Sequence, residues 1–269
     1  MRKTGFDIGA GSPERLGATA TADGCNFAVY SRHAERIEIC LFDAAGEQEL
    51  RRLALPDRHG DVHCGFIAGL LPASRYGLRA YGPFDPSGGH RFDPSKLLVD
   101  PYALAIDRPF VFSTDLSLPP DRAVDTARLV PKAVVATPPS PLAVARWGTR
   151  HTQPAAVNRH RPGLIYELNV RAFSKLQPDV PLELRGTVAA LRAPAVLDHF
   201  GKLGVSAVEL MPVAAWIDER HLPPLGLANA WGYNPITMMA LDPRLAPGGI
   251  DDLADTVSAL HAAGIEGLL

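Results

Sequence analysis

Two patterns of hydrophobic and polar positions divide the chain. Up to about residue 110, apolar and polar positions alternate in short runs that are rich in aromatic and β-branched side chains. Such runs predict β-strands, and clusters of turn-forming residues separate them. The predicted strands are 25–30, 36–42, 62–67 and 75–81. Several short strands with no helical period between them indicate a β-sandwich over residues 1–112.

After Gly163 the pattern changes to strands that alternate with helices. Strands are predicted at 164–170 and 205–211, and helices at 194–203 and 251–263. In the last helix, Leu253, Val257 and Leu260 recur at helical spacing, and Gly264 follows as a C-terminal cap. A third strand is expected to begin at Ile265. Repeated strand–helix–strand units predict a parallel sheet.

The two patterned regions are separated by a proline-rich stretch over residues 113–162. Prolines recur through it and interrupt any helix or central strand. Apolar residues at Val134, Val135 and Trp147 suggest that it packs against its neighbours. We therefore interpret it as a connector between two domains.

Composition and charge exclude several classes of function. The 269 residues carry 27 basic and 29 acidic side chains, a formal net charge of −2, which favours neither nucleic acid nor an anionic membrane. No apolar run reaches about 18 residues and the N-terminus lacks a signal-peptide pattern, so no membrane association and a cytoplasmic location are expected.

The three cysteines, Cys25, Cys40 and Cys64, are odd in number and widely spaced, so they are expected to be buried reduced thiols. His59, His63 and Cys64 have a spacing close to that of metal ligands. A turn that leads into a strand accounts for them more simply, and neither a metal nor another cofactor is predicted.

Several segments, in order along the whole chain, resemble one family. They are 11–18, 76–83, 91–103, 165–171, 185–187, 218–221 and 231–234. Together they resemble the N-terminal part of bacterial glycogen debranching enzymes, the isoamylase-type members of the α-amylase superfamily. The resemblance implies a carbohydrate-binding-like sandwich, then the first two to three βα units of an incomplete (β/α)8 barrel over residues 163–269.

The resemblance also implies an activity and a partner. These enzymes hydrolyse the α-1,6 branch linkages of glycogen by a retaining mechanism that needs two carboxyl groups about 5–5.5 Å apart. In the family those groups follow later barrel strands, so the catalytic residues are expected C-terminal to Leu269. The chain alone is then expected to be inactive. Its partners would be glycogen or another branched α-glucan and, if separately encoded, the remaining part of the barrel.

The candidate substrate-binding residues lie in the long loop after the second barrel strand. By resemblance, Tyr233 stacks on the sugar whose bond is cleaved, and Trp231 and Asn234 support that loop. Asp218, Glu219 and His221 lie in the same loop, and they either line the substrate site or belong to a solvated charged loop. The candidate residues are Tyr233, Trp231, Asn234, Asp218, Glu219 and His221.

Two other interpretations remain open. The chain could be a non-catalytic α-glucan-binding protein, or the remnant of a broken gene. Phe84, Phe92 and Tyr102 are candidate sugar-binding aromatic residues of the sandwich, although that domain could serve mainly to pack against the barrel.

Overall fold

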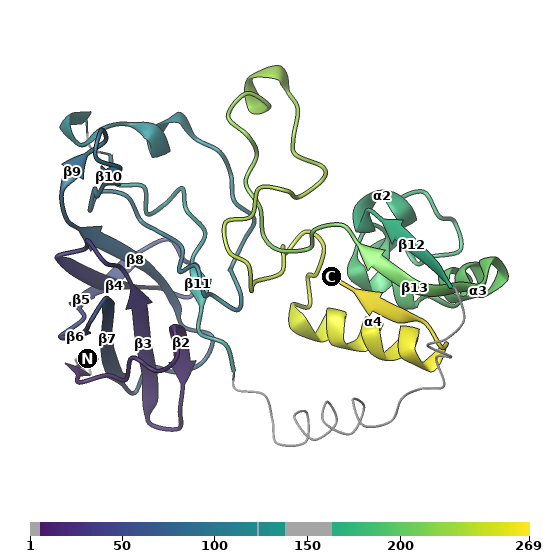
Figure 1. Cartoon of the computed structure of the whole chain (residues 1–269), viewed down its shortest axis with the longest axis horizontal. Helices are drawn as coiled ribbons and strands as arrows, with labels where there is room; N and C mark the ends of the chain where they lie inside the picture. The colour runs from purple at the N-terminus through teal and green to yellow at the C-terminus, as the bar shows by residue number, and fades with distance from the viewer. Residues whose placement is uncertain (1–5, 123, 138–162) are drawn as a thin grey trace. The chain divides into compact units, whose positions relative to one another are not determined.

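The computed structural model describes residues 6–122, 124–137 and 163–269, shown in colour in Figure 1. These residues form two compact units. The first contains the described residues up to 137 together with 215–228 and 234–240, and the second contains 163–214, 229–233 and 241–269. No helix in this described part of the chain is long and apolar enough to cross a membrane.

The first unit is built on two antiparallel sheets. One sheet has the strand order β1 (Ile8–Gly9), β7 (Val62–Ala68), β3 (Gly24–Tyr30), β2 (Gly17–Ala20), with β6 (Asp57–His59) also paired to β7. The other has the order β11 (Ala133–Val134), β8 (Arg75–Tyr81), β4 (Arg36–Phe42), β5 (Glu49–Ala54). A short hairpin joins β9 (Phe84–Asp85) and β10 (His90–Arg91).

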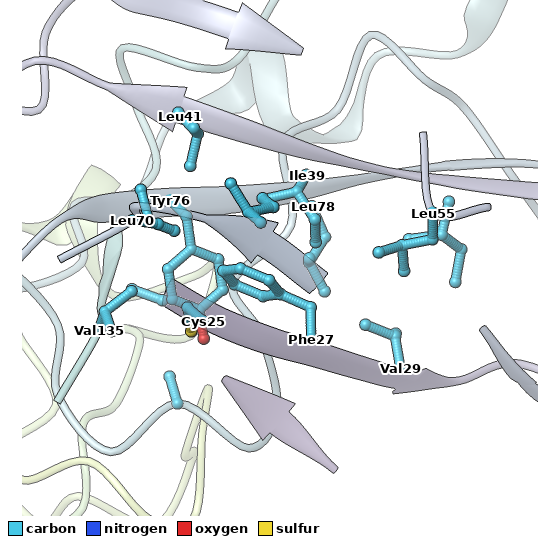
Figure 2. Packing of buried hydrophobic residues seen from close by; sticks show 14 of the residues in the cluster. Cys25, Phe27, Val29, Ile39, Leu41, Leu55, Leu70, Tyr76, Leu78 and Val135 are labelled. Atoms are coloured by element: carbon cyan, nitrogen blue, oxygen red, sulfur yellow. The ribbon is translucent and has the colours of Figure 1, made fainter. Parts of the chain in front are cut away.

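One hydrophobic core lies between these two sheets, which confirms the predicted sandwich. Figure 2 shows its centre, where the rings of Phe27 and Tyr76 pack edge to face with centroids 5.0 Å apart. Tyr76 is fully buried, and its hydroxyl donates a hydrogen bond to Asp100 Oδ2 at 2.7 Å. The polar tip of the ring is therefore satisfied inside an otherwise apolar core.

The sandwich unit extends beyond residue 112, where the sequence analysis placed its end. Strand β11 pairs with β8, and Val135 is buried in the core between the sheets. Ala127 and Val130 pack with Cys40 and Phe42 in a second cluster. The 3-10 helices η1 (Thr114–Ser117) and η2 (Pro120–Arg122) connect these parts. Prolines exclude long elements here, but they permit a two-residue edge strand and buried apolar anchors.

Val135 thus packs against the first of the two neighbours that the connector interpretation named, Val134 is half-buried, and Trp147 lies outside the described residues. The short strand β6 was predicted as a turn because Pro56 and Gly60 bracket three polar residues. It forms a tight hairpin with β7, in which His59 lies opposite Val62 and Gly60 and Asp61 make the turn.

The second unit contains a parallel sheet of three strands, as predicted. Their order is β12 (Leu164–Leu168), β13 (Val205–Leu210), β14 (Glu266–Leu268). The helical elements are α2 (Val170–Ser174), η3 (Leu182–Leu184), η4 (Val188–Arg192), α3 (Pro194–Leu203) and α4 (Ile250–Ala262). Gly204 caps the C-terminus of α3 and Gly264 follows α4, both in the left-handed region with φ of 70° and 77°.

The first of these strands is shorter than predicted. Asn169 ends it, because its side-chain oxygen accepts a hydrogen bond from the Ala172 N–H at 2.9 Å and caps α2. Beneath this helix, Phe173 stacks on Phe200 of α3 with ring centroids 5.5 Å apart.

The loop between β13 and α4 does not fold as one piece of the second unit. Ala215 and Ala240 are buried in a cluster with Ile106 of the first unit, and Thr237 Oγ1 donates a hydrogen bond to Pro101 O at 3.0 Å. The loop also holds η5 (Pro223–Leu225). Residues 215–228 and 234–240, which lie within the predicted barrel region, therefore belong to the first unit.

Candidate functional site

The structure divides the predicted site residues between two places. Asp218, Glu219 and Asn234 belong to the first unit, and Trp231 and Tyr233 belong to the second. His221 is exposed and does not line the pocket that Asp218, Glu219 and Asn234 share.

A pocket of about 450 Å³ in the first unit contains three of the predicted residues. Asp218, Glu219 and Asn234 line it together with the aromatic rings of Phe110 and Phe112. Its volume is in the range of about 300–1,000 Å³ that is typical of small-molecule sites. Sequence reasoning missed the two phenylalanines, because they lie in a segment with no regular periodicity.

Backbone pairing holds the acidic wall of this pocket in place. The Ile217 N–H donates a hydrogen bond to Asn234 O at 3.0 Å, and Trp216 pairs with Pro235 as an isolated antiparallel bridge. Trp216 is 3% exposed, so the loop is anchored by a buried ring directly before the acidic residues. Lys96 also lines the pocket, and its Nζ donates a hydrogen bond to Asp115 O at 2.9 Å.

The pocket combines the two kinds of group that a sugar needs. Carboxylate and amide oxygens accept hydrogen bonds from hydroxyl groups, and aromatic rings pack against apolar C–H faces. The arrangement is therefore suited to a polyhydroxylated ligand rather than to a purely apolar one.

Residues 229–233 of the second unit form an exposed aromatic pair. Trp231 and Tyr233 are 66% and 60% exposed, with ring centroids 6.5 Å apart and planes inclined by 45°. Asn229 Oδ1 accepts hydrogen bonds from the N–H groups of Trp231 and Gly232, both at 2.9 Å. Gly232 adopts a φ of 84°, which favours glycine.

A second asparagine fixes this segment to the parallel sheet. Asn169, which follows β12, donates from Nδ2 to Ala230 O at 2.9 Å while its Oδ1 caps α2. Sequence reasoning treated Asn169 as part of the strand. Its position at the end of a predicted strand, where polar side chains reach the loops, is the signal that could have identified it.

The candidate aromatic residues of the sandwich differ in exposure. Phe84 and Tyr102 are 46% and 42% exposed, whereas Phe92 is partly buried against the core. Phe92 also lines a groove of about 670 Å³ in the first unit, together with Tyr30 and His90. Phe92 therefore does not offer a fully exposed ring face on which a sugar could stack.

The cysteines are free and buried, as predicted. Burial raises the pKa of the Cys25 and Cys40 thiols to about 12. Of the three residues with metal-like spacing, His59 and Cys64 lie close together, and Asp57 joins them. His63 precedes Cys64 on the same strand, so its side chain points to the other face of the sheet.

Comparisons with known proteins agree with these features. Residues 15–103 match the family described as carbohydrate-binding module 48, the isoamylase N-terminal domain. The chain is 42% identical to the glycogen debranching enzyme of Klebsiella pneumoniae over 268 residues, which cover 97% of the chain and 39% of that enzyme. It is 43% identical to the glycogen debranching enzyme of Yersinia pseudotuberculosis, over 96% of the chain and 39% of the enzyme.

The chain is similar to the N-terminal part of glycogen debranching enzymes. The resemblance seen in the sequence motifs is thereby confirmed. The chain spans about two fifths of the length of these curated relatives.

Solved structures show the same fold at lower identity. The catalytic module of SpuA, a glycogen-degrading pneumococcal virulence factor, aligns over 94% of the chain and 36% of its own length, with a TM-score of 0.68 and 18% identity. Pullulanase from Paenibacillus barengoltzii, solved with maltohexaose and α-cyclodextrin, aligns over 95% of the chain and 37% of its length, with a TM-score of 0.61 and 19% identity. These likenesses concern the fold alone.

Proposed function

We propose that residues 1–269 are the glucan-recognising N-terminal part of a glycogen debranching enzyme. In this account residues 163–269 supply the first βα units of a (β/α)8 barrel, and the partner is glycogen or another branched α-glucan. The observation that carries the proposal is the exposed pair Trp231 and Tyr233, whose backbone two asparagines hold in place.

Such a pair suits a glucan for a physical reason. The C–H faces of glucose are apolar and bury well against an aromatic ring, while the hydroxyl groups at the edge stay hydrated. A loop that already holds both rings loses little conformational freedom on binding. The match to a carbohydrate-binding module and the similarity to glycogen debranching enzymes favour the same class of ligand.

The pocket of Asp218, Glu219 and Asn234 provides a second contact for the same polymer. Its two phenylalanines offer apolar faces, and its oxygens accept hydrogen bonds from sugar hydroxyls. A branched glucan has many equivalent glucose units, so two separate contacts on one protein increase the overall affinity without any further interaction.

Hydrolysis needs more than recognition. A retaining glycosidase uses one carboxylate as nucleophile and another carboxyl group as acid and base, about 5–5.5 Å apart. In a (β/α)8 barrel these groups lie at the carboxyl ends of the strands, and the family resemblance puts them after Leu269. We therefore propose that residues 1–269 alone bind branched α-glucan without cleaving it, and that α-1,6 hydrolysis requires the later barrel strands.

Calorimetric titration of the chain with a branched limit dextrin tests the recognition site. Tyr233→Ala is expected to weaken binding about two- to tenfold, which corresponds to one aromatic contact. Tyr30→Ala is the matched control, because Tyr30 is 58% exposed in the sandwich. Equal affinities of wild type and Tyr233→Ala would contradict the assignment.

A second candidate function, a glucan-binding protein that acts through its sandwich alone, is favoured by the family match at residues 15–103. It predicts the opposite result. Affinity would then be lost on replacing Phe84 or Tyr102, and Tyr233→Ala would leave it unchanged.

A further inference from the structure

The edge of the first sheet brings together three side chains that commonly bind transition metals. Strands β6 and β7 pair antiparallel, with Asp57 directly opposite Cys64. His59 follows Asp57 by two residues and therefore lies on the same face of β6. One potential ligand atom from each of the three residues lies within 4.8 Å of the other two.

We infer that Asp57, His59 and Cys64 bind one thiophilic divalent cation, of which Zn²⁺ is the best match. A thiolate, an imidazole nitrogen and a carboxylate oxygen are all common zinc ligands, with bonds of about 2.0–2.3 Å. The thiolate disfavours Mg²⁺ and Ca²⁺, which prefer oxygen ligands. This inference is independent of the proposed glucan recognition.

The geometry is close to what the cation requires. Bonds of about 2.0–2.3 Å in a tetrahedron place ligand atoms about 3.3–3.8 Å apart, so the three atoms, which lie within 4.8 Å of one another, need to approach by no more than about 1.0–1.5 Å. Cys64 is buried within the sheet, whereas His59 is exposed on a short edge strand and can rotate. Three protein ligands leave the fourth position for water, on the solvent side of His59.

The surroundings of the carboxylate support this arrangement. The Gly11 N–H donates a hydrogen bond to Asp57 Oδ2 at 3.0 Å, which orients the carboxylate and leaves Oδ1 for a cation. A thiolate from Cys64 and the carboxylate of Asp57 together neutralise the two positive charges of the cation.

A bound cation would connect three parts of the sandwich. Its ligands come from β6 and β7, and Asp57 in turn holds the segment at Gly11. Strand β6 has three residues and pairs with β7 alone among the strands of its sheet. We therefore expect the cation to stabilise this edge of the sandwich.

The test uses the full chain, reduced and without a polyhistidine tag. Titration with Co²⁺ is followed by absorption, because a thiolate ligand gives a sulfur-to-cobalt charge-transfer band. Zn²⁺ affinity is then measured by competition with a chromogenic chelator. We expect one cation per chain, a charge-transfer band, and a rise in the melting temperature on adding Zn²⁺.

Variants of the three ligands identify the site. Asp57→Asn, His59→Gln and Cys64→Ser are each expected to weaken Zn²⁺ binding by about tenfold or more. His33→Gln and Cys40→Ser are the matched controls and should leave it unchanged. Because His59 is exposed, His59→Gln should keep the melting temperature of the metal-free protein, which separates loss of a ligand from loss of folding.

Two results would overturn the inference. One is a folded wild-type chain that shows no thiolate–cobalt band at saturating Co²⁺. The other is a band and a Zn²⁺ affinity that survive in both His59→Gln and Cys64→Ser, because the cation would then be bound elsewhere.

Discussion

The guanidinium of Arg79 and the carboxylate of Asp125 form a bidentate pair, in which Arg79 Nη2 donates hydrogen bonds to both oxygens at 2.8 and 2.9 Å. The Arg79 side chain is 1% exposed, and Asp125 comes from the stretch that follows the predicted sandwich. Glu49 accepts a further hydrogen bond from Nη2 at 3.0 Å. The buried guanidinium of Arg79 on β8 is thus neutralised by one carboxylate from β5 and one from the segment that precedes β11.

Removing both acidic partners should leave that buried cation uncompensated. Glu49→Gln with Asp125→Asn is expected to lower the free energy of unfolding by about 3–5 kcal/mol, and each single change by about 1 kcal/mol, because one carboxylate then remains. Urea denaturation followed by circular dichroism measures this. Asp255→Asn is the control, since the exposed pair of Arg192 and Asp255 should contribute no more than about 1 kcal/mol. Purely additive effects would contradict the account.

The segment 113–137, which contains Asp125, should determine how far the sandwich can be truncated without loss of stability. A polypeptide of residues 1–112 lacks Asp125, the strand β11 and the buried Val135. We expect residues 1–137 to unfold cooperatively at a higher urea midpoint than residues 1–112. Indistinguishable urea midpoints of the two polypeptides would show that the segment adds no stability.

Two glycines near the end of α3 should respond oppositely to the same change. Gly204 has a φ of 70°, so Gly204→Ala should destabilise the fold by about 1–2 kcal/mol. Gly201 lies within the helix with no atom within 4 Å of an added Cβ, so Gly201→Ala should stabilise it by up to about 1 kcal/mol. Thermal unfolding of the full chain measures both. Changes of the same sign would contradict the assigned backbone geometry.

Alkaline pH should destabilise the first unit through its buried thiols. Burial raises the pKa of Cys25 and Cys40 from 9.0 to about 12. Their contribution is therefore fully present below pH 9 and is lost as the pH rises toward 12. Burial also lowers the pKa of Lys132 from 10.5 to about 8, and this acts in the opposite direction between those values.

Comparison of the wild type with the variant Cys40→Ala isolates the effect of the Cys40 thiol on stability. In Cys40→Ala the loss of stability with pH above 9 should be shallower than in the wild type, by up to about 1.4 kcal/mol per pH unit. Urea midpoints at a series of pH values give the two slopes, and the contribution of Lys132 cancels. Parallel slopes would contradict the assigned burial of Cys40.

The pocket of the first unit should contribute to glucan affinity through its carboxylates. Asp218→Ala and Glu219→Ala each remove an acceptor for a sugar hydroxyl, and a charged hydrogen bond contributes about 1.5–3 kcal/mol, so each should weaken binding about tenfold or more. Calorimetric titration with the limit dextrin measures the affinities, with Glu183→Ala as an exposed control. If both pocket variants bind as tightly as the wild type, the glucan does not occupy this pocket.

Local pattern predicted the regular elements well. The strands 36–42 and 75–81 and the helix 194–203 have the predicted bounds, because each has a clear period and a cap or turn at its ends. The strands β2 and β5 and the short strands β6 and β11 were not predicted. Strand β11 has two residues and forms because β8, distant in sequence, offers unpaired hydrogen-bonding groups, whereas β6 has three residues and pairs with the adjacent β7.

The candidate site was predictable in composition but not in arrangement. Motifs pointed to the segments at 218–221 and 231–234, but sequence did not show that the loop divides between two units. That division depends on buried contacts of Ala215, Ala240 and Thr237, which carry no motif. The proximity of Asp57, His59 and Cys64 likewise depends on the register between β6 and β7. Strand pairing sets that register, and it cannot be inferred from composition.

Electrophoresis of the 269-residue chain through a gel that contains glycogen tests the central claim most directly. We predict slower migration than in a gel without glycogen, and uniform iodine staining around the band afterwards, since the chain should bind the polymer without debranching it. Unchanged migration would contradict glucan recognition. A zone of altered iodine colour would show hydrolysis, and would place catalytic carboxylates within residues 1–269.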